Sequence, residues 1–271
     1  MKVAVVGHVE WVEFVRVEHV PAPGEIVNAL DSWEAPAGGG AVAAVQLAKL
    51  AGTCTLFTLL GDDELGRRAQ AELARRGVEV QCEFVERPTR RAFTFVDENG
   101  ERTITTIGEK LHPGQSHHLP WMELSRADGV YFTAGDVTAL EAARRARIVV
   151  ATSRELATLR RGAVELDALV GSGEDMAEQY QAGDLDPPPR LVVSTAGSLG
   201  GWTQPGGPFR AVPLPAPVSD AYGAGDSFAA GLTYALAKGL EREEALELAS
   251  SCGASALTGR GPYEGQLTAP P

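Results

Sequence analysis

Short apolar runs alternate with helix-like segments along most of this chain. The segments between the first runs, AVAAVQLAKLAG (41–52) and DDELGRRAQAELARRG (62–77), have helical composition and end in glycine. Such alternation predicts a mostly parallel sheet with helices on both faces, so the fold class is α/β. The predicted strands are KVAVVG (2–7), TCTLFTLLG (53–61), VEV (78–80), GVYFTAG (129–135), RIVVAT (147–152) and RLVVSTAG (190–197).

Two segments depart from this alternation. PGEIVNALDSWEAPAGGG (23–40) and RRAFTFVDENGERTITTIG (90–108) are typical of amphipathic strands. The second contains a hairpin turn at Glu98-Asn99-Gly100, because Asn-Gly is a strong short-range turn signal. Strands that cluster outside the parallel series predict a small separate sheet, which would act as a lid over a ligand site.

Charge and composition narrow the class of partner. The formal net charge of −12 argues against nucleic acid or an anionic membrane as the main partner, because both require a basic face. No stretch reaches membrane-spanning length, and the chain is expected to be cytoplasmic. The three cysteines are widely separated and predict neither a disulfide framework nor a zinc site. We therefore expect a small-molecule ligand; an anionic one would be bound by local backbone amides and arginines.

Two common nucleotide motifs are absent. GDDELGRR (61–68) has the glycine spacing of a P-loop but carries Arg67-Arg68 where lysine and a magnesium-binding hydroxyl are needed. The first strand ends in VVGHVEW, without the further glycines of a dinucleotide fingerprint.

The stretch DAYGAGDSF (220–228) is a stronger candidate. Gly223 and Gly225 permit unusual backbone conformations before a helix that extends to about Lys238-Gly239. The amides of 223–227 would be unpaired and convergent, which is typical of an anion-binding turn. Asp226 has two interpretations: it caps the helix, or it accepts a proton from a hydroxyl that attacks a phosphoryl group.

These residues resemble the C-terminal signature D-T-x-G-A-G-D of the ribokinase-like (PfkB) carbohydrate kinases. Further features of that family occur in the expected order along nearly the whole chain. They are PGE at 23–25, GGG at 38–40, GDDELG at 61–66, DENGERTI at 97–104 and STAGSLGG at 194–201.

The resemblance implies a ribokinase-like three-layer αβα domain with a mostly parallel central sheet and a small β-sheet lid. A single domain would span 1–271, with lid strands within about 8–40 and 90–108. The implied reaction moves the γ-phosphate of ATP to a hydroxymethyl group, with Asp226 as the base. Gly223, Ala224 and Gly225 would form the anion hole.

The family's other ligands are also implied by the resemblance. Thr195, Gly197 and Gly200 match the loop that contacts ATP. Glu155, in TSRE (152–155), matches a motif associated with Mg²⁺ and phosphate, although Thr152 replaces its asparagine. Asp220 and the carbonyl of Tyr222 correspond to a monovalent cation site for K⁺. The resemblance further implies a homodimer formed through the lid sheets.

The substrate end departs from the family pattern. Glu10 and Val12 align with polar positions that hold sugar hydroxyls, and every plausible register places Val42, Ala43 or Ala44 at the family's asparagine. The expected substrate-binding positions are Glu10, Val12, Gly38, Gly39, Gly40 and Arg91. Arg90 or Arg91 would pair with an anionic substrate, or else lie on a solvated strand edge.

These departures leave the acceptor open. The leading hypothesis is a kinase of a sugar or similar polyhydroxylated molecule other than ribose. A nucleoside or other non-sugar acceptor is an alternative, in which Trp11, Phe14 or Trp33 would stack on a ring or else serve only in packing. A second alternative is a non-catalytic relative of these kinases that binds a nucleotide or another ligand.

Overall fold

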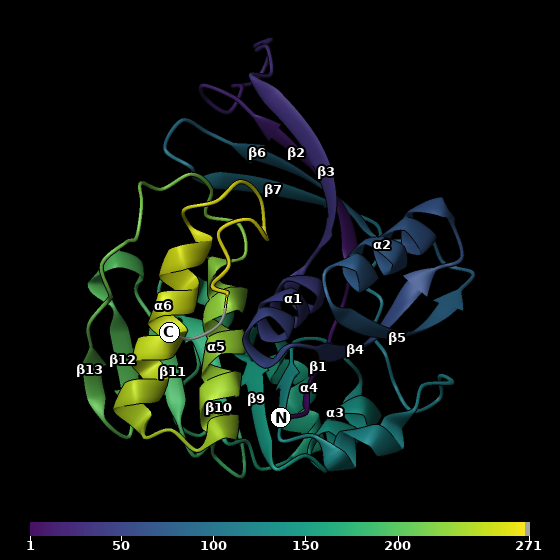
Figure 1. Cartoon of the computed structure of the whole chain (residues 1–271), viewed down its shortest axis with the longest axis vertical. Helices are drawn as coiled ribbons and strands as arrows, with labels where there is room; N and C mark the ends of the chain where they lie inside the picture. Colours follow the sequence, from purple (N-terminus) through teal and green to yellow (C-terminus); the bar gives the residue numbers. More distant parts are fainter. Residues whose placement is uncertain (269–271) are drawn as a thin grey trace.

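A computed structural model describes residues 1–268, which form two β-sheets. Sheet A has nine strands in the order β13-β12-β11-β10-β9-β8-β1-β4-β5, and sheet B has four in the order β3-β2-β6-β7. Sheet B stands at one end of the molecule, apart from sheet A (Figure 1). Among these residues no helix has the length and apolar character needed to cross a membrane.

Sheet A is the parallel sheet that the alternation predicts. Neighbouring strands from β5 to β11 are parallel, and β12 is antiparallel to both of its neighbours, β11 and β13. The short strands β10, β12 and β13 were not among the predicted runs. The strands are β1 (Val3–Val6), β4 (Cys54–Gly61), β5 (Val78–Val85), β8 (Gly129–Phe132), β9 (Ile148–Thr152), β10 (Ala168–Ser172), β11 (Val192–Thr195), β12 (Gly201–Gln204) and β13 (Gly207–Phe209).

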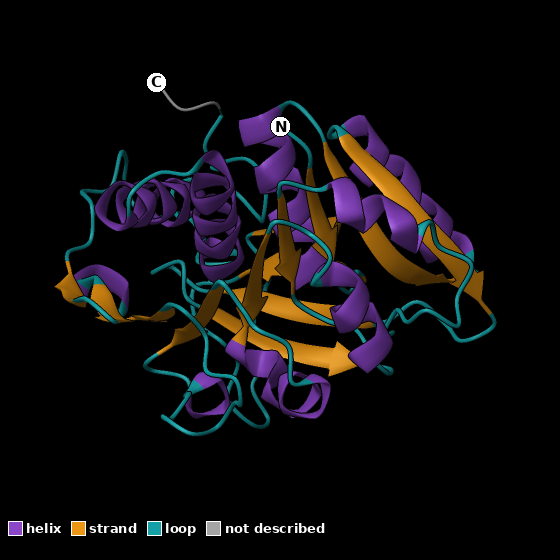
Figure 2. Cartoon of the chain, turned by 90° about the horizontal axis from the view of Figure 1, so that it is seen from below, coloured by secondary structure: helices purple, strands orange, loops and turns teal. Residues whose placement is uncertain are grey.

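Helices cover both faces of sheet A (Figure 2). In β1, Val3 and Val5 pack toward one helical layer, while Ala4 and Val6 pack toward the other. Strands buried on both faces are continuously apolar, which explains the runs in the sequence. The three-layer prediction is therefore confirmed. One layer contains α1 (Gly39–Ala51), α2 (Glu64–Arg75), α5 (Ala224–Lys238) and α6 (Arg242–Ala256); the other contains the 3₁₀ helix η1 (Trp121–Arg126), α3 (Val137–Ala143) and α4 (Leu156–Gly162).

Sheet B is the predicted lid sheet. It consists of β2 (Glu10–Arg16), β3 (Asp31–Ala37), β6 (Arg91–Val96) and β7 (Arg102–Ile107). The hairpin turn between β6 and β7 lies where Asn-Gly predicts it, and Gly100 adopts φ +78°. The inner face packs on the main domain: Phe14 is fully buried, with its ring centroid 5.2 Å from that of Trp33 and 5.0 Å from that of Tyr222.

Phe14→Ala tests this inward packing. Removal of a fully buried ring is expected to lower the free energy of unfolding by about 3–5 kcal/mol, because a cavity remains beneath the sheet. Phe95→Ala is the matched control, since Phe95 is only partly buried on the opposite face. Urea unfolding followed by circular dichroism measures both. A loss below about 1 kcal/mol for Phe14→Ala would contradict the packing described here.

Candidate functional site

The turn before α5 leaves backbone amides without hydrogen-bond acceptors. Gly223 is the N-cap residue, with φ +80°, and an added Cβ there would lie 2.7 Å from Val42 Cγ1. The first backbone bond of the helix runs from the Ser227 amide to the Gly223 carbonyl, so the amides of 224–226 have no acceptor within the helix. An added Cβ on Gly225 would meet nothing within 4 Å. The amides at the start of α5 therefore border open space.

Asp226 lies in the first turn of α5 and does not cap it. The cap is Gly223, three residues earlier, so the capping interpretation is wrong. The reason is that Gly223 adopts the left-handed conformation that begins the helix before the carboxylate is reached. No side chain or backbone group of residues 1–268 donates a hydrogen bond to the Asp226 carboxylate. The group is partly accessible and free to accept a proton.

The environment holds the pKa of Asp226 near neutrality. Desolvation is the main cause and raises the pKa from its ordinary value to about 6. Arg102 and Arg154 oppose this shift, whereas the negative charges of Glu178 and Glu10 add to it. A carboxylate with this pKa is suited to general-base chemistry at neutral pH.

The triple glycine at 38–40 brings the start of α1 against the same carboxylate. An added Cβ on Gly39 would lie 2.9 Å from Asp226 Oδ1 and 2.6 Å from Thr133 Oγ1. An added Cβ on Gly40 would lie 2.6 Å from the His8 carbonyl oxygen. Only glycines allow this approach, which extends α1 two residues toward the site compared with the predicted start at 41. The two long helices α1 and α5 thus begin next to each other.

Glu10 and His8 line the space beside Gly38. Both would contact a Cβ on that residue, at 3.2 Å for Glu10 Cγ and 3.0 Å for His8 Nε2. The Tyr222 hydroxyl donates to Glu10 Oε1 over 3.4 Å, and it accepts from the Gly38 amide over 3.3 Å. Glu10 also forms an ion pair with Arg90 at 3.4 Å.

These polar groups are not saturated by the protein. Burial raises the pKa of Glu10 against the opposing charge of Arg90, and burial together with Lys110 lowers the pKa of His8 well below its ordinary value. Buried polar groups without partners are uncommon and point to a missing ligand. Near this space the buried His8 Nδ1 has no hydrogen-bond partner, and Glu10 Oε2 and Arg90 Nε have no hydrogen bond beyond their mutual ion pair at 3.4 Å.

The other expected substrate positions divide between this space and the outer surface. Val12 is fully buried in the core, where it packs rather than faces a ligand. Arg91 pairs in register with Trp11, on the opposite face of sheet B from Val12, and is exposed. Arg90, not Arg91, therefore reaches Glu10. His8 was missed by the sequence reasoning, although its place directly after the first strand and Gly7 was a usable signal.

The aromatic residues proposed for ring stacking are used in packing. Phe14 contacts Trp33 and Tyr222, as described above. Trp11 is 3% exposed, and the guanidinium of Arg68 lies 4.2 Å from its ring centroid. These contacts leave none of the three rings with a free face toward the space beside Gly38.

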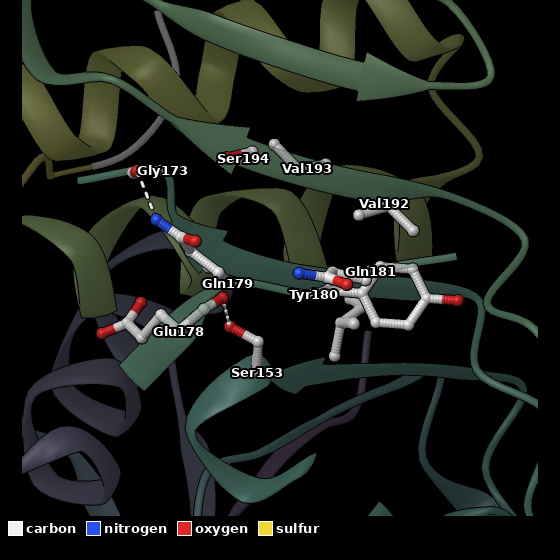
Figure 3. A pocket seen from close by; sticks show the side chains of 11 residues that line it. Ser153, Gly173, Glu178, Gln179, Tyr180, Gln181, Val192, Val193 and Ser194 are labelled. Atoms are coloured by element: carbon white, nitrogen blue, oxygen red, sulfur yellow. Dashed lines mark hydrogen bonds between the residues drawn. The ribbon is translucent and has the colours of Figure 1, made fainter. Parts of the chain in front are cut away.

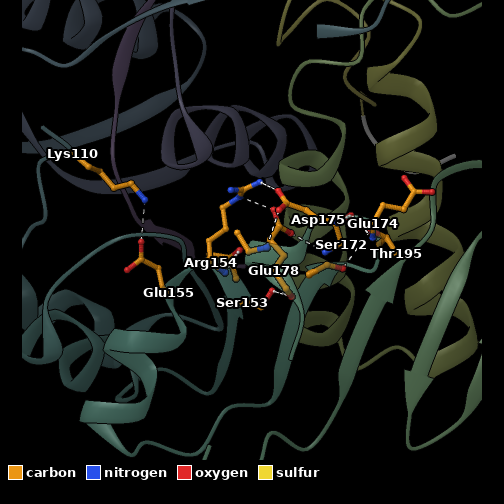
Figure 4. Close-up of polar contacts among 12 residues, drawn as sticks. Lys110, Ser153, Arg154, Glu155, Ser172, Glu174, Asp175, Glu178 and Thr195 are labelled. Atoms are coloured by element: carbon orange, nitrogen blue, oxygen red, sulfur yellow. Dashed lines mark hydrogen bonds and ion pairs between the residues drawn. The ribbon is translucent and has the colours of Figure 1, made fainter. Parts of the chain in front are cut away.

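A network of ion pairs lies beside Asp226, at the carboxyl ends of β9 and β10. Arg154 contacts Asp175 at 2.5 Å and Glu178 at 2.6 Å, while the expected Glu155 is buried and pairs with Lys110 at 3.1 Å (Figure 4). Glu178, rather than Glu155, is the neighbour that raises the pKa of Asp226. Sequence reasoning missed both Arg154 and Glu178, because the network depends on the fold of the 173–181 loop.

The expected ATP loop follows β11. Thr195 donates to the Gly171 carbonyl over 3.4 Å, and Gly197 and Gly200 adopt φ +51° and +90°. An added Cβ on Gly200 would lie 2.2 Å from the Phe209 carbonyl oxygen, so this turn requires glycine. The loop lies at the carboxyl ends of parallel strands, where ligands bind in open α/β sheets.

A cavity of about 210 Å³ lies next to this edge of the sheet, beneath the loop after β10 (Figure 3). Ser153 donates across it to the Glu178 carbonyl over 2.5 Å, and the Gln179 side chain donates to the Gly173 carbonyl over 3.3 Å. Its lining includes Glu178 but neither Asp226 nor the 195–200 loop. This cavity is therefore distinct from the space that Gly39 and Asp226 border.

The acidic side chains at this edge are better suited to Mg²⁺ that is already bound to a nucleotide than to a metal ion held by the protein alone. Within residues 1–268, no group of three or more His, Cys, Asp or Glu side chains is arranged to hold a metal ion. Mg²⁺ bound to phosphates needs only one or two protein carboxylates. Glu178 and Asp175 lie at the edge beside Asp226, where both are ion-paired with Arg154.

Comparison with known proteins places the chain among related sequences. It is 34% identical over 110 residues to a ribokinase from Dictyostelium discoideum, covering 39% of this chain but only 34% of that protein. It is 28% identical over 279 residues to an ATP-dependent ribose-1-phosphate kinase from Halopiger xanaduensis, covering 94% of this chain and 91% of that protein.

The fold is shared with solved structures. A ribokinase from Cryptococcus neoformans, solved in complex with ADP, matches with a TM-score of 0.76 at 21% identity, covering 98% of this chain and 97% of that one. The family model for pfkB family carbohydrate kinases matches residues 1–157 and 141–269. This protein belongs to the pfkB family of carbohydrate kinases.

Proposed function

We propose that this chain is an ATP-dependent kinase that phosphorylates a hydroxyl group of a small polyhydroxylated molecule. The observation that carries the proposal is the unpartnered Asp226 carboxylate, which lies beside the free amides of α5 and against Gly39. A protein that only binds nucleotide has no use for a negative charge at that position, because it would repel the phosphates.

The proposed chemistry uses this arrangement directly. Asp226 accepts the proton of the acceptor hydroxyl while the hydroxyl oxygen forms a bond to the γ-phosphorus of ATP. The bond between the γ-phosphorus and the β-phosphate oxygen breaks, and ADP leaves. The amides of Gly223, Ala224 and Gly225, with the dipole of α5, stabilise the negative charge on the transferred group. Mg²⁺ brought with ATP would supply further neutralisation, held by Glu155, as the family resemblance implies, or by Glu178 with Asp175.

The other parts of the site receive matching roles. Thr195, Gly197 and Gly200 contact the nucleotide at the carboxyl edge of sheet A. His8 binds the acceptor through Nδ1, which has no protein partner, and Glu10 and Arg90 bind it through Oε2 and Nε, whose only protein contact is their 3.4 Å ion pair. The chain works as one kinase domain with sheet B as its lid, in the cytoplasm. Pairing of the lid sheets in a homodimer is part of the same proposal.

The acceptor class follows from the polar lining. Glu10 and neutral His8 together offer acceptors and a donor to hydroxyl groups, and Arg90 adds a further donor. The rings at Trp11, Phe14 and Trp33 are already occupied, which favours a polyhydroxylated acceptor over a nucleoside base that needs stacking. An ADP-release assay over sugars, sugar phosphates and nucleosides identifies the acceptor; ATP binding without turnover on any of them would favour a non-catalytic binder.

Asp226→Asn tests the proposed base. Nucleotide should still bind, while turnover should fall by about 10²–10⁴-fold, because the amide cannot accept the proton. Asp128→Asn is the matched control, since Asp128 immediately precedes β8 at the opposite edge of the sheet. Near-normal turnover in Asp226→Asn, measured by ADP release, would refute the mechanism.

The pH dependence of turnover tests the same group. The raised pKa of Asp226, about 6, means that the basic form is lost as the pH falls through that value. The ratio kcat/KM should therefore be level above pH 7 and decline roughly tenfold per pH unit well below 6. A profile of kcat/KM against pH measures this, because kcat/KM reports the pKa values of the free enzyme. A decline in rate centred near pH 4, where an ordinary aspartate titrates, would contradict the environment assigned to Asp226.

Arg90→Met tests the acceptor subsite. The KM for the acceptor should rise about tenfold or more while the KM for ATP stays constant, because only the acceptor loses a donor. Arg91→Met is the matched control on the opposite face of the lid and should change neither constant. Equal effects at the two positions would remove Arg90 from the subsite.

A further inference from the structure

The tip of the β6–β7 hairpin is joined to the turn that precedes α5. The Ala221 amide donates to the Gly100 carbonyl over 2.9 Å, and an added Cβ on Gly100 would lie 3.1 Å from the Ser219 carbonyl oxygen. Two lid arginines complete the contact. Arg102 donates to the Ala221 carbonyl over 2.7 Å, and Arg16 donates to the Ser219 carbonyl over 2.6 Å.

These two carbonyls flank Asp220, which is fully buried. Asp220 Oδ1 accepts from the Tyr222 amide over 2.8 Å, and Oδ2 accepts from the Gly261 amide over 3.0 Å. Burial raises the pKa of Asp220, and these amides together with the charges of Arg102 and Arg16 oppose the rise. The buried carboxylate therefore already has backbone donors and two positive charges.

A bound K⁺ does not fit this arrangement. A monovalent cation between Asp220 and the Tyr222 carbonyl would add a third positive charge beside one carboxylate and two guanidinium groups. The Ser219 and Ala221 carbonyls on either side already accept hydrogen bonds from arginine.

We propose that Arg16 and Arg102 are positioning residues that serve as a built-in cation for the anion-binding turn. They hold the carbonyls around Asp220 outward, so that the following residues turn their amides toward the phosphate. The proposal rests on the kinase function proposed above. With Arg16 and Arg102 in this role, turnover does not depend on monovalent cations.

The origin of the two arginines gives this device a second property. Arg16 ends β2 and Arg102 begins β7, so both belong to sheet B. Movement of the lid away from the main domain would break both guanidinium contacts and the bond between Gly100 and Ala221. The turn is then fully braced only when the lid is docked, and phosphoryl transfer is linked to lid closure.

The test exchanges K⁺ for choline at constant ionic strength and follows two quantities, turnover and melting temperature. Wild-type turnover is expected to be equal in the two salts, and K⁺ should give no stabilisation beyond that of choline. Wild-type protein that loses most of its turnover in choline, or that melts at a higher temperature specifically in K⁺, would overturn the proposal. The melting arm needs no turnover, so it decides the cation question even if no acceptor is ever phosphorylated.

Arg102→Met tests the role of the side chain. It should lower kcat by about ten- to hundredfold, because a charge-assisted hydrogen bond is lost, while the KM for ATP changes little. Guanidinium ion at millimolar concentration should restore part of kcat. Arg102→Lys, which keeps the charge, should retain more activity than Arg102→Met, and Arg126→Met on the exposed end of η1 should behave as wild type. Unchanged kcat in a folded Arg102→Met protein, or loss of kcat without rescue by either guanidinium or lysine, would refute the role.

Discussion

The close approach of Gly39 to Asp226 is the constraint on which the candidate site depends. No side chain fits between the start of α1 and the carboxylate, since a Cβ on Gly39 would lie 2.9 Å from Asp226 Oδ1 and 2.6 Å from Thr133 Oγ1. Glycine lets two helices of 13 and 15 residues begin at one point, with their free amides and positive dipole ends near the same carboxylate. A larger residue at 39 would separate the base from the rest of the site.

The local electrostatics contrast with the overall charge. The chain carries a net charge of −12, yet Asp226 lies near two arginines, and its neighbours form alternating ion pairs. Glu10, paired with Arg90, lies on one side of Asp226. Glu178, paired with Arg154, lies on the other side. Partly buried pairs of this kind contribute little net stability, because desolvation offsets the attraction. Their value here is to fix the positions and the charge state of the groups around Asp226.

The lid contributes more than a cover. Its inner face supplies Glu10 to the space beside Gly38, and Arg90, which immediately precedes β6, pairs with Glu10. The end of β2 supplies Arg16 and the start of β7 supplies Arg102 to the turn before α5. In the proposed mechanism, acceptor binding and phosphate binding therefore both depend on sheet B.

Local patterns were enough to predict the layered α/β fold, the lid hairpin at Asn99-Gly100 and the candidate motif at 220–226. These depend on periodicity, turn chemistry and a short contiguous motif, all of which are local. The three-dimensional structure was needed to show that Asp226 does not cap α5, that Arg90 rather than Arg91 reaches Glu10, and that Glu178 rather than Glu155 acts on Asp226. It also decided that Arg16 and Arg102 occupy the surroundings of Asp220. Each of these outcomes depends on contacts between residues far apart in the chain, and on which face of a strand a side chain occupies, where a shift of one residue reverses the answer.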